Sequence, residues 1–452
     1  MQTSGDHVQA HQFMTRRLVS ALVTGDVTGN EMPARRATLG LFFGILAALL
    51  AMGGFWLYGL LSPGGNSAWR QPGSIVLEKE TGNRYLFIDG KLRPVANLSS
   101  ALLGAGSNPQ MRSVSRNSLR GIEHGPPVGI PGAPDVLPEP SRVVSGALLI
   151  CAATGREGAA LTHLVIDPDI ATTAIARSSR LRVAAPDGRE YLVADGVGYR
   201  LKDRAVTVAM GLDTTPPIRV SGTWITALPK GRDLAPFTVK RAGERGPVVA
   251  DKTSRRGDLF EVTSGSGTHR YYLSLADGLA PISSLEYALL SVDGAKARSI
   301  TAADVAAARR SSEDSLLNRF PDLLGGVAAT PPPTLCLRQE LKEATPKRTR
   351  APEVKELVSV PAQALTGEPV QVAAGHGLLG VAMVQKDDRV VPLRFLITDL
   401  GKRYHVPGDQ ELRALGLADA PQMLVPNQLL AYVPSGPDLS AEAATRTPNE
   451  VT

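Results

Sequence analysis

The sequence is poor in the residues and motifs that build common catalytic sites. Its 452 residues include only two cysteines, seven histidines and 5% aromatic residues. It contains no Gly-x-x-x-x-Gly-Lys-Ser/Thr, His-Glu-x-x-His or Cys-x-x-Cys string, which excludes a P-loop and argues against the usual zinc motifs. Lys and Arg are not interleaved with aromatic residues, so the net charge of +6 does not indicate a nucleic-acid groove. We therefore expect no catalytic residues, no metal site and no nucleic-acid partner.

Two short stretches come nearest to a ligand site. The glycine-rich segment Ser264 to His269 (SGSGTH) lacks the lysine of a P-loop and is typical of a β-turn. His163, Asp167 and Asp169 in THLVIDPDI are metal-ligand residue types, but the Asp-Pro step favours a turn. The cofactor-binding residues, if there are any, stay unknown from the sequence.

One long uncharged stretch stands out near the N-terminus. Residues 39–61 (LGLFFGILAALLAMGGFWLYGLL) would form a helix of about 34 Å, long enough to cross a bilayer. Because 38 residues precede it, we interpret it as an uncleaved transmembrane anchor rather than a signal peptide. Four arginines precede the stretch and only Arg70 follows closely. The positive-inside rule then predicts a cytoplasmic segment 1–38 and a main body outside the membrane.

The cytoplasmic segment contains an amphipathic pattern. Within VQAHQFMTRRLVSALV (residues 8–23), Met14, Leu18 and Leu22 recur at helical spacing. We expect a helix that packs on a partner subunit or on the membrane surface. The alternative is a loosely structured basic segment leading into the anchor.

A short phrase recurs four times along the rest of the chain. YLFIDG, YLVADG, YLSLADG and RFLITDLG each predict a strand, a tight turn, a second strand and then a short helix. An Asp-Gly pair supplies the positive φ that a tight hairpin needs, and the fourth turn is one residue longer. The predicted turn residues are Asp89, Gly90, Asp195, Gly196, Asp277, Gly278, Asp399 and Gly401.

The four repeats match in pairs. The first and third align over residues 94–103 and 281–290, and the second and fourth align over residues 199–234 and 404–439 without a gap. This pattern suggests a duplicated pair of units related by a pseudo-two-fold axis. A single hairpin with one helix cannot bury its own apolar face, so we expect the units to pack together.

The sequence between the repeats predicts a separate β-rich domain. Strand-like stretches precede the second repeat and follow the third, so both parts would assemble into one central domain. Cys151 lies in the first part and Cys336 in the second. Outside the membrane such a pair suggests one disulfide, whose loop of about 185 residues is worth about 4–5 kcal/mol of stability. The alternative is two buried free thiols.

These patterns together predict an α+β, mostly β fold: a single transmembrane helix followed by an elongated extracytoplasmic body of four β-hairpin/helix repeats around a central β-rich domain. The predicted segments are 1–38 (cytoplasmic), 39–61 (transmembrane), 73–106 (repeat 1), 107–179 (connector and first part of the central domain), 180–234 (repeat 2), 258–291 (repeat 3), 292–383 (second part of the central domain), 384–439 (repeat 4) and 440–452 (disordered tail).

The whole pattern resembles the EccB family, the membrane-anchored B component of the actinobacterial type VII (ESX) secretion system. The resemblance rests on an N-terminal helix with RRL, one anchor, four YLxxDG-type repeats, the connector GIPGAPDVLP and one cysteine on each side of the central region. It implies an inner-membrane core complex with EccC (related to the FtsK/SpoIIIE ATPases), EccD and EccE, and self-association. Family members are often labelled ATPases, so the resemblance implies ATP as a label only, with no residue to attach it to and no cofactor required.

Three hypotheses for function follow. The first is a structural and assembly subunit of the secretion complex, because recurrence in four units argues for architecture. The second is an ATP-hydrolysing component with an unfamiliar site. The third is a cell-wall-binding scaffold that contacts peptidoglycan, because β-hairpin repeats commonly present extended binding surfaces.

Overall fold

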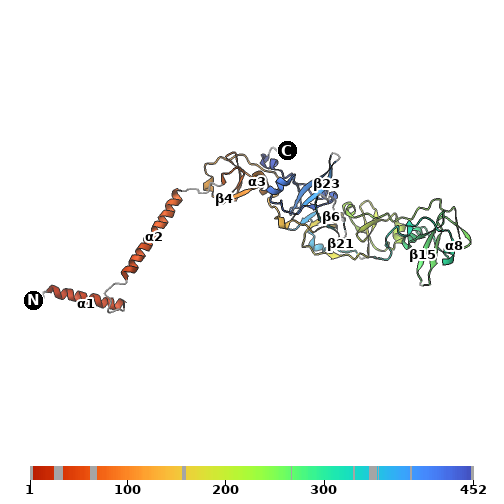
Figure 1. The fold of residues 1–452 in the computed structure, drawn as a ribbon, viewed down its shortest axis with the longest axis horizontal. Coiled ribbons are helices and arrows are strands. Elements are labelled where there is room, and N and C mark those ends of the chain that lie inside the picture. The colour runs from red at the N-terminus through yellow and green to blue at the C-terminus, as the bar shows by residue number, and fades with distance from the viewer. Residues whose placement is uncertain are drawn as a thin grey trace. The chain divides into compact units, whose positions relative to one another are not determined.

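The computed structural model divides the chain into two units (Figure 1). The first comprises residues 1–67 with 114–121, and the second comprises residues 68–113 with 122–452. The structure describes residues 4–24, 34–61, 69–154, 159–265, 267–328, 331–345, 354, 356–386 and 389–448.

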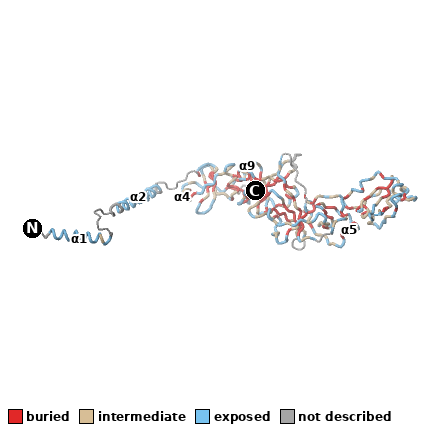
Figure 2. The backbone as a smooth tube through the Cα atoms, turned by 60° about the horizontal axis from the view of Figure 1, so that its bottom comes forward, coloured by how far each residue is buried: buried red, intermediate tan, exposed pale blue. Residues whose placement is uncertain are grey.

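The first unit consists mainly of two long helices. Helix α1 (Ser4–Thr24) includes the predicted amphipathic stretch, which confirms the helix. Helix α2 (Ala34–Leu61) contains one apolar span, Thr38–Tyr58, with a mean hydropathy of 2.0. It is the one such span among the described residues, and all of its side chains are exposed (Figure 2). Length and apolar composition therefore make α2 the candidate membrane helix.

A six-stranded sheet forms the centre of the second unit. Its order is β22-β6-β5-β19-β21-β7, and β5 pairs antiparallel with both β6 and β19. The strands come from before the second repeat and after the third, as the strand-like stretches there predict. Their bounds are β5 Ala147–Thr154, β6 Ala160–Ile166, β7 Thr173–Ala174, β19 Leu335–Glu340, β21 Glu356–Ser359 and β22 Val370–Val372.

All four repeats share one topology. Each is a sheet in which the chain's first three strands form a meander and a fourth strand returns beside the first, giving the order third-second-first-fourth. One helix follows the third strand and another follows the fourth. In repeat 1 the elements are β1 Ser74–Glu78, β2 Arg84–Ile88, β3 Lys91–Pro94, α3 Leu98–Ala105, β4 Gln110–Val114 and α4 Arg116–Leu119. In repeat 2 they are β8 Ser179–Ala184, β9 Glu190–Ala194, β10 Val197–Arg200, α5 Arg204–Ala209, β11 Ile218–Arg219 and α6 Gly222–Ala227.

Repeats 3 and 4 follow the same order of elements. In repeat 3 these are β14 Leu259–Thr263, β15 His269–Ser274, β16 Leu279–Ile282, α7 Ser284–Leu290, β17 Arg298–Ser299 and α8 Ala302–Ala307. In repeat 4 they are β23 Gly377–Lys386, β24 Arg389–Thr398, β25 Arg403–His405, α9 Asp409–Ala414, β26 Met423–Leu424 and α10 Asn427–Leu430. The remaining named elements are the hairpin β12 Arg245–Val249 with β13 Lys252–Arg255, strands β18 Val327–Ala328 and β20 Lys342–Glu343, and the 3-10 helices η2 Pro140–Arg142, η4 Ser315–Leu317 and η5 Ala362–Ala364.

The observed repeat boundaries differ from the predicted ones. Strand β17 and helix α8 complete repeat 3, and β23 opens repeat 4, although the sequence places these residues in the second part of the central domain. The first and third repeats are therefore full copies like the second and fourth, not a shorter type of unit. The fourth strands of repeats 2 to 4 are only two residues long, too short for any apolar periodicity to reveal them.

The C-terminal segment is ordered where the sequence predicts a disordered tail. Helix α11 (Ala441–Thr445) begins at Ser440, whose hydroxyl accepts a hydrogen bond from the Ala443 amide. Ala444 is fully buried in the same apolar cluster as Leu103 of α3. Small side chains give this helix a close fit without a marked apolar pattern, which explains why the prediction for residues 440–448 is wrong. Residues 449–452 lie outside the described residues.

Shared cores join the repeats to the central sheet. One apolar cluster includes strands β5 and β6, helix α6 of repeat 2 and strand β24 of repeat 4. In it the buried Trp224 indole N–H donates to the Ile150 carbonyl oxygen at 3.1 Å. A second cluster joins α5 of repeat 2 to α7 of repeat 3. Figure 2 shows these buried residues running through the body. Because burying a large apolar side chain stabilises by about 1.5–3 kcal/mol, such clusters fix how neighbouring repeats sit on each other.

Candidate functional site

The first two predicted turns have the backbone that their sequence requires. Asp89 and Gly90 have φ of 52° and 76°, and Asp195 and Gly196 have φ of 46° and 72°. Two consecutive positive φ values match a type I′ hairpin turn, which Asp-Gly tolerates better than most dipeptides. Their side chains are left on the surface.

The third turn differs from the prediction. Its loop contains four residues between the paired Ser274 and Leu279, and Asp277 is not in the left-handed region. Asp277 instead accepts hydrogen bonds from the Ser312 amide at 2.8 Å and the Ser311 hydroxyl at 2.7 Å. These bonds lower the pKa of Asp277 to about 2. The carboxylate therefore ties the turn to a later segment of the same repeat.

The fourth turn also uses its carboxylate as a tether. Gly401 has φ of 66°, and an Asp399 oxygen accepts from the Gly375 amide at 3.0 Å. Gly278, in the third turn, has φ of 157° and lies against the chain at Arg309 and Arg310. The four aspartates thus do not share one environment, so the repeated phrase maintains chain reversals rather than a repeated ligand site.

The two cysteines form the disulfide that their number suggests. Cys151 and Cys336 are directly opposed on the antiparallel strands β5 and β19, and both are fully buried. The bond joins residues 185 positions apart in the chain. It therefore ties the two parts of the central sheet together around the intervening repeats. The described residues include no free cysteine.

The possible metal-ligand residues are not arranged as a site. His163 is buried opposite Cys151, and its Nδ1 has no hydrogen-bond partner among the described residues. Burial lowers the pKa of His163, and the nearby Glu368 opposes that shift. Asp167 instead accepts a hydrogen bond from the Asp169 amide at 3.0 Å, as expected for a local turn. In the part of the chain that the structure describes, no three metal-ligating side chains gather together.

The glycine-rich stretch is a hairpin loop. It connects β14 to β15, whose last pair before the loop is Thr263 with His269. Within it the Thr268 amide donates to the Ser264 hydroxyl oxygen at 3.1 Å. The Gly267 amide also donates to the Ser264 carbonyl oxygen at 2.9 Å, a local bond of the kind that the glycine-rich sequence predicts. Residue 266 lies outside the described residues.

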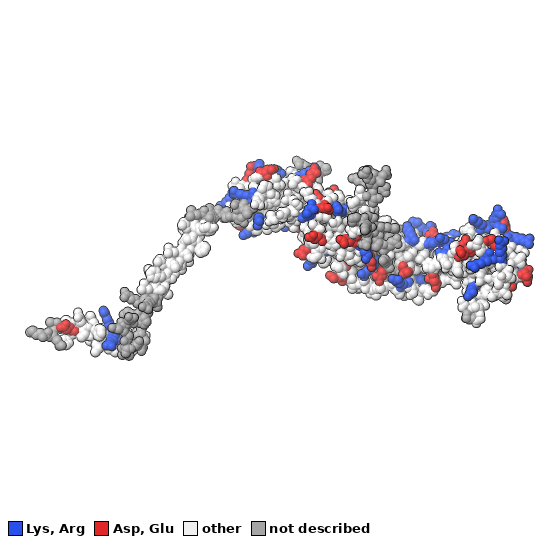
Figure 3. All heavy atoms as spheres, in the orientation of Figure 1, with Lys and Arg blue, Asp and Glu red and all other residues white. Residues whose placement is uncertain are grey.

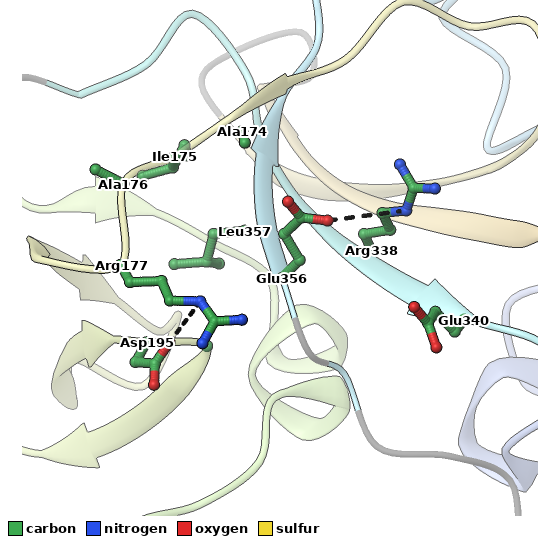
Figure 4. Close-up of a pocket in the computed structure, with 10 residues that line it drawn as sticks. Ala174, Ile175, Ala176, Arg177, Asp195, Arg338, Glu340, Glu356 and Leu357 are labelled. Atoms are coloured by element: carbon green, nitrogen blue, oxygen red, sulfur yellow. Dashed lines mark ion pairs between the residues drawn. The ribbon is translucent and has the colours of Figure 1, made fainter.

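A polar cleft lies between repeat 2 and the central sheet. Its volume is about 420 Å³, and its walls are the segment after β7, the Asp195-Gly196 turn and the strands β19 and β21. Figure 4 shows Arg177 reaching Asp195 at 3.7 Å on one side and Arg338 reaching Glu356 at 3.9 Å on the other. Both separations are longer than a charge-assisted hydrogen bond, so the four groups have capacity to bond other polar groups.

The chemistry of this cleft suits recognition by polar side chains. It presents two guanidinium groups and the carboxylates of Asp195, Glu340 and Glu356 (Figure 4). It contains neither a nucleophile paired with a base nor a glycine-rich phosphate cradle. Sequence reasoning missed Arg177, Arg338, Glu340 and Glu356, because they come from separate strands and only the fold brings them together.

A basic surface covers repeat 3. Figure 3 shows Lys and Arg gathered there, over the region that contains β15 and α8 in Figure 1. The contributing segments are 240–256, which includes the β12–β13 hairpin, and 296–310. Of these cations Arg256 pairs with Glu244 at 3.1 Å, and Arg298 lies over the Phe260 ring at 4.6 Å. The surface is suited to an acidic partner.

Comparisons with known proteins place the chain among secretion components. A family described as "Type VII secretion system ESX-1, transport TM domain B" matches residues 2–452. The ESX-2 secretion system ATPase EccB2 of Mycobacterium tuberculosis is 28% identical over 97% of this chain and 94% of that protein. The ESX-1 secretion system ATPase EccB1 of the same species is 26% identical over 98% and 94% of the two chains.

Solved structures show the same fold. A chain of an intact ESX-5 inner membrane complex superposes with a TM-score of 0.64 at 24% identity, covering 99% of this chain and 95% of that chain. The EccB3 dimer from the ESX-3 core complex gives a TM-score of 0.63 at 23% identity, covering 82% of this chain and 99% of that chain. The mostly β body with its N-terminal helices is therefore a fold shared with proteins of those assemblies.

Proposed function

This chain belongs to the EccB family of type VII (ESX) secretion systems, and from that premise we propose that it is a structural and assembly subunit of an inner-membrane core complex. In this role it supports protein export across the cell envelope. The observation that carries the proposal is the body itself, in which one strand-and-helix motif occurs four times around a disulfide-linked sheet. Repetition of a motif multiplies surfaces for assembly, whereas one reaction needs one site.

The proposal assigns each unit a place. Helix α2 spans the inner membrane once, helix α1 lies in the cytoplasm, and the second unit lies outside. Arginines flanking the N-terminal end of α2 support this orientation through the positive-inside rule. Protease added to intact spheroplasts should then digest the body and spare a tag at the N-terminus. Digestion of the tag in sealed spheroplasts would reverse the orientation.

The partners we propose are the other core components, an EccC-type ATPase of the FtsK/SpoIIIE class, EccD and EccE, together with further copies of this chain. A tagged full-length chain should retain such an ATPase and multi-spanning proteins when it is purified from its native membrane in mild detergent. Recovery of the chain alone from membranes that contain those proteins would contradict the assembly role.

Helix α1 is the surface through which we expect cytoplasmic docking. Its apolar side chains Met14, Leu18 and Leu22 are all exposed. Leu18→Asp with Leu22→Asp should reduce recovery of the partners, while the matched control Gln12→Asp on the same helix should not. Normal recovery with the double variant would remove α1 from the assembly interface.

Two other functions are kept as alternatives. The names of the relatives include the word ATPase, so ATP turnover by the purified full chain is worth measuring. Turnover that persists through repurification and is lost on a point substitution would assign the hydrolysis to this subunit, and its absence would leave hydrolysis to the EccC-type partner. Sedimentation of the chain with purified peptidoglycan would favour the cell-wall-binding scaffold.

A further inference from the structure

Three of the four repeats cover the edge of their sheet with their own chain. After the second helix the chain returns along the third strand and makes two successive main-chain contacts with it. The second contact is a hydrogen bond from Val128 N to Pro94 O, from Leu234 N to Arg200 O and from Leu439 N to His405 O, at 2.9, 2.7 and 2.8 Å respectively. In each case the donor residue is also buried in the core.

Repeat 3 makes only the first of these contacts. The Ser311 amide donates to the Leu279 carbonyl oxygen at 2.9 Å, as the equivalent residues do elsewhere. The chain then leaves the line of β16 and forms the 3-10 helix η4, which packs against β16 through Leu316 in the local core. In the other repeats the second donor lies three residues after the first, which corresponds to Asp314 in repeat 3. No described residue donates a hydrogen bond to the Pro281 carbonyl oxygen. The main-chain edge of β16 is therefore unpaired at the Pro281 carbonyl.

A cavity of about 550 Å³ lies along this open edge. Pro281 and Ile282 of β16 form one wall, and Tyr272, Val305 and Leu317 supply further apolar surface. Its remaining lining includes the cations Arg270 and Arg310 with His269, and Arg310 belongs to the basic surface defined above. An apolar groove beside a free strand edge has the features of a β-strand addition site.

We propose that this groove binds an extended acidic–apolar peptide segment of another protein, which adds as a strand to the β16 edge. Repeats 2 and 4 show the binding mode within this chain. There the returning segments read Gly-Arg-Asp-Leu (231–234) and Gly-Pro-Asp-Leu (436–439), with the leucine buried. Asp233 lies 3.7 Å from Arg200, and Asp438 lies 3.5 Å from His405.

The same chemistry is expected of the foreign segment. Its backbone N–H donates to the Pro281 carbonyl oxygen, its apolar side chain enters the groove, and its carboxylate faces Arg270 and Arg310. Charge complementarity selects an acidic partner, because the rim of the groove is cationic. The proposal goes beyond the assembly role above and does not depend on which secretion partners are recovered.

A synthetic peptide can test the groove directly. The probe is acetyl-VPSGPDLSA, the returning segment of repeat 4 (residues 433–441), labelled with a fluorophore and titrated onto the detergent-solubilised full chain. We expect saturable binding, and a control peptide with Asn and Ala in place of Asp and Leu should bind at least about tenfold more weakly. Absence of saturable binding at millimolar peptide would overturn the proposal.

Variants at the rim locate the binding. Arg310→Glu and Leu317→Glu, both at exposed positions, should each weaken the probe about tenfold. The matched control is Lys230→Glu, the equivalent exposed cation in repeat 2, whose edge is already covered. It should leave the affinity within about twofold. Equal losses for Lys230→Glu and Arg310→Glu would mean non-specific attraction and would refute the groove.

Discussion

Replacing Arg319 by methionine should destabilise the junction of repeats 2 and 3 more than the loss of any surface charge. The Glu286 carboxylate in α7 is fully buried, and both of its oxygens accept from Arg319, at 2.8 and 3.0 Å. The Phe237 amide donates to the same carboxylate at 3.1 Å. The Arg319 side chain is itself only 12% exposed, so water cannot take over its role.

The expected cost follows from leaving a buried charge alone. Removing one partner of a buried ion pair typically costs about 3–5 kcal/mol. The matched control is Arg338→Met, which breaks a pair with Glu356 that is 42% and 46% exposed and 3.9 Å apart. Exposed pairs of this kind contribute about 0–1 kcal/mol. Both substitutions remove a guanidinium group, so the difference between their losses in unfolding free energy measures the effect of burying the ion pair.

The stability lost in Arg319→Met should also depend on pH. Burial already raises the pKa of Glu286, and Arg319 opposes that shift. Without Arg319 the folded-state pKa rises further above the unfolded value of about 4.3. The unfolded chain then releases its proton first, so the deficit of Arg319→Met grows as pH rises above about 4 and shrinks below it.

Urea unfolding of the full chain in detergent, with hydrogen exchange of α7 (Ser284–Leu290) as the local readout, measures these effects. Adding Glu286→Gln to Arg319→Met should recover much of the loss, because the remaining buried group is neutral. The reasoning is refuted if Arg319→Met costs no more than Arg338→Met. It is equally refuted if the added Glu286→Gln makes the double variant worse at neutral pH.

Three further predictions use the same unfolding assay. Replacing Cys151 and Cys336 by alanine should lower the free energy of unfolding by about 4–5 kcal/mol, and a reductant should reproduce the loss in the unmodified chain. Gly436→Ala should cost about 1–3 kcal/mol, because a Cβ there overlaps the buried Tyr404 ring, and no loss would show that the ring moves aside freely. Because burial lowers the pKa of His163 below 6.5, stability should rise with pH up to about 6.5 and fall on acidification. A His163→Gln variant should show a smaller fall on the same pH series.

The sequence was informative where a pattern lasts for several residues. The apolar run of α2 and the strand-turn-strand part of each repeat follow from length, periodicity and turn residues alone. The capping box that starts α8 at Thr301 was also predictable, and its Thr301 and Asp304 bonds are present. The two-residue strand β17 carries no period, so the later half of repeat 3 could not be recognised. Helix α11 was missed because its five residues, three of them alanine, are too few and too small to show a clear apolar pattern.

The candidate sites could not be predicted, because they depend on registers between distant segments. The cleft in Figure 4 brings together Arg177 and Glu356, which no local motif connects. The edge of β16 is recognised as open only by comparison with the covered edges of the other three repeats. The sequence shows that repeats 2 and 4 are alike over residues 199–234 and 404–439, and the structure gives a physical reason for that similarity.

The similarity of repeats 2 and 4 follows from how the segment returning along the third strand packs on that strand. In repeats 2 and 4 a glycine passes beneath a tyrosine ring, as Gly231 beneath Tyr199 and Gly436 beneath Tyr404. The glycine and the tyrosine depend on each other, because a Cβ at the glycine would overlap the tyrosine ring. Where one member stays large, the other must stay glycine, which keeps these two segments alike.

Repeat 3 has Ala280 at the tyrosine position, so the space above the returning segment is not filled by a ring. A side chain can then stand where the other repeats need glycine, and Ser311 does. Its hydroxyl donates to Asp277 at 2.7 Å, and the next amide donates to the same carboxylate. These bonds hold the chain at the turn of the hairpin instead of letting it continue along β16. The lowered pKa of Asp277 follows from these bonds, which lie where the returning segment leaves the line of β16.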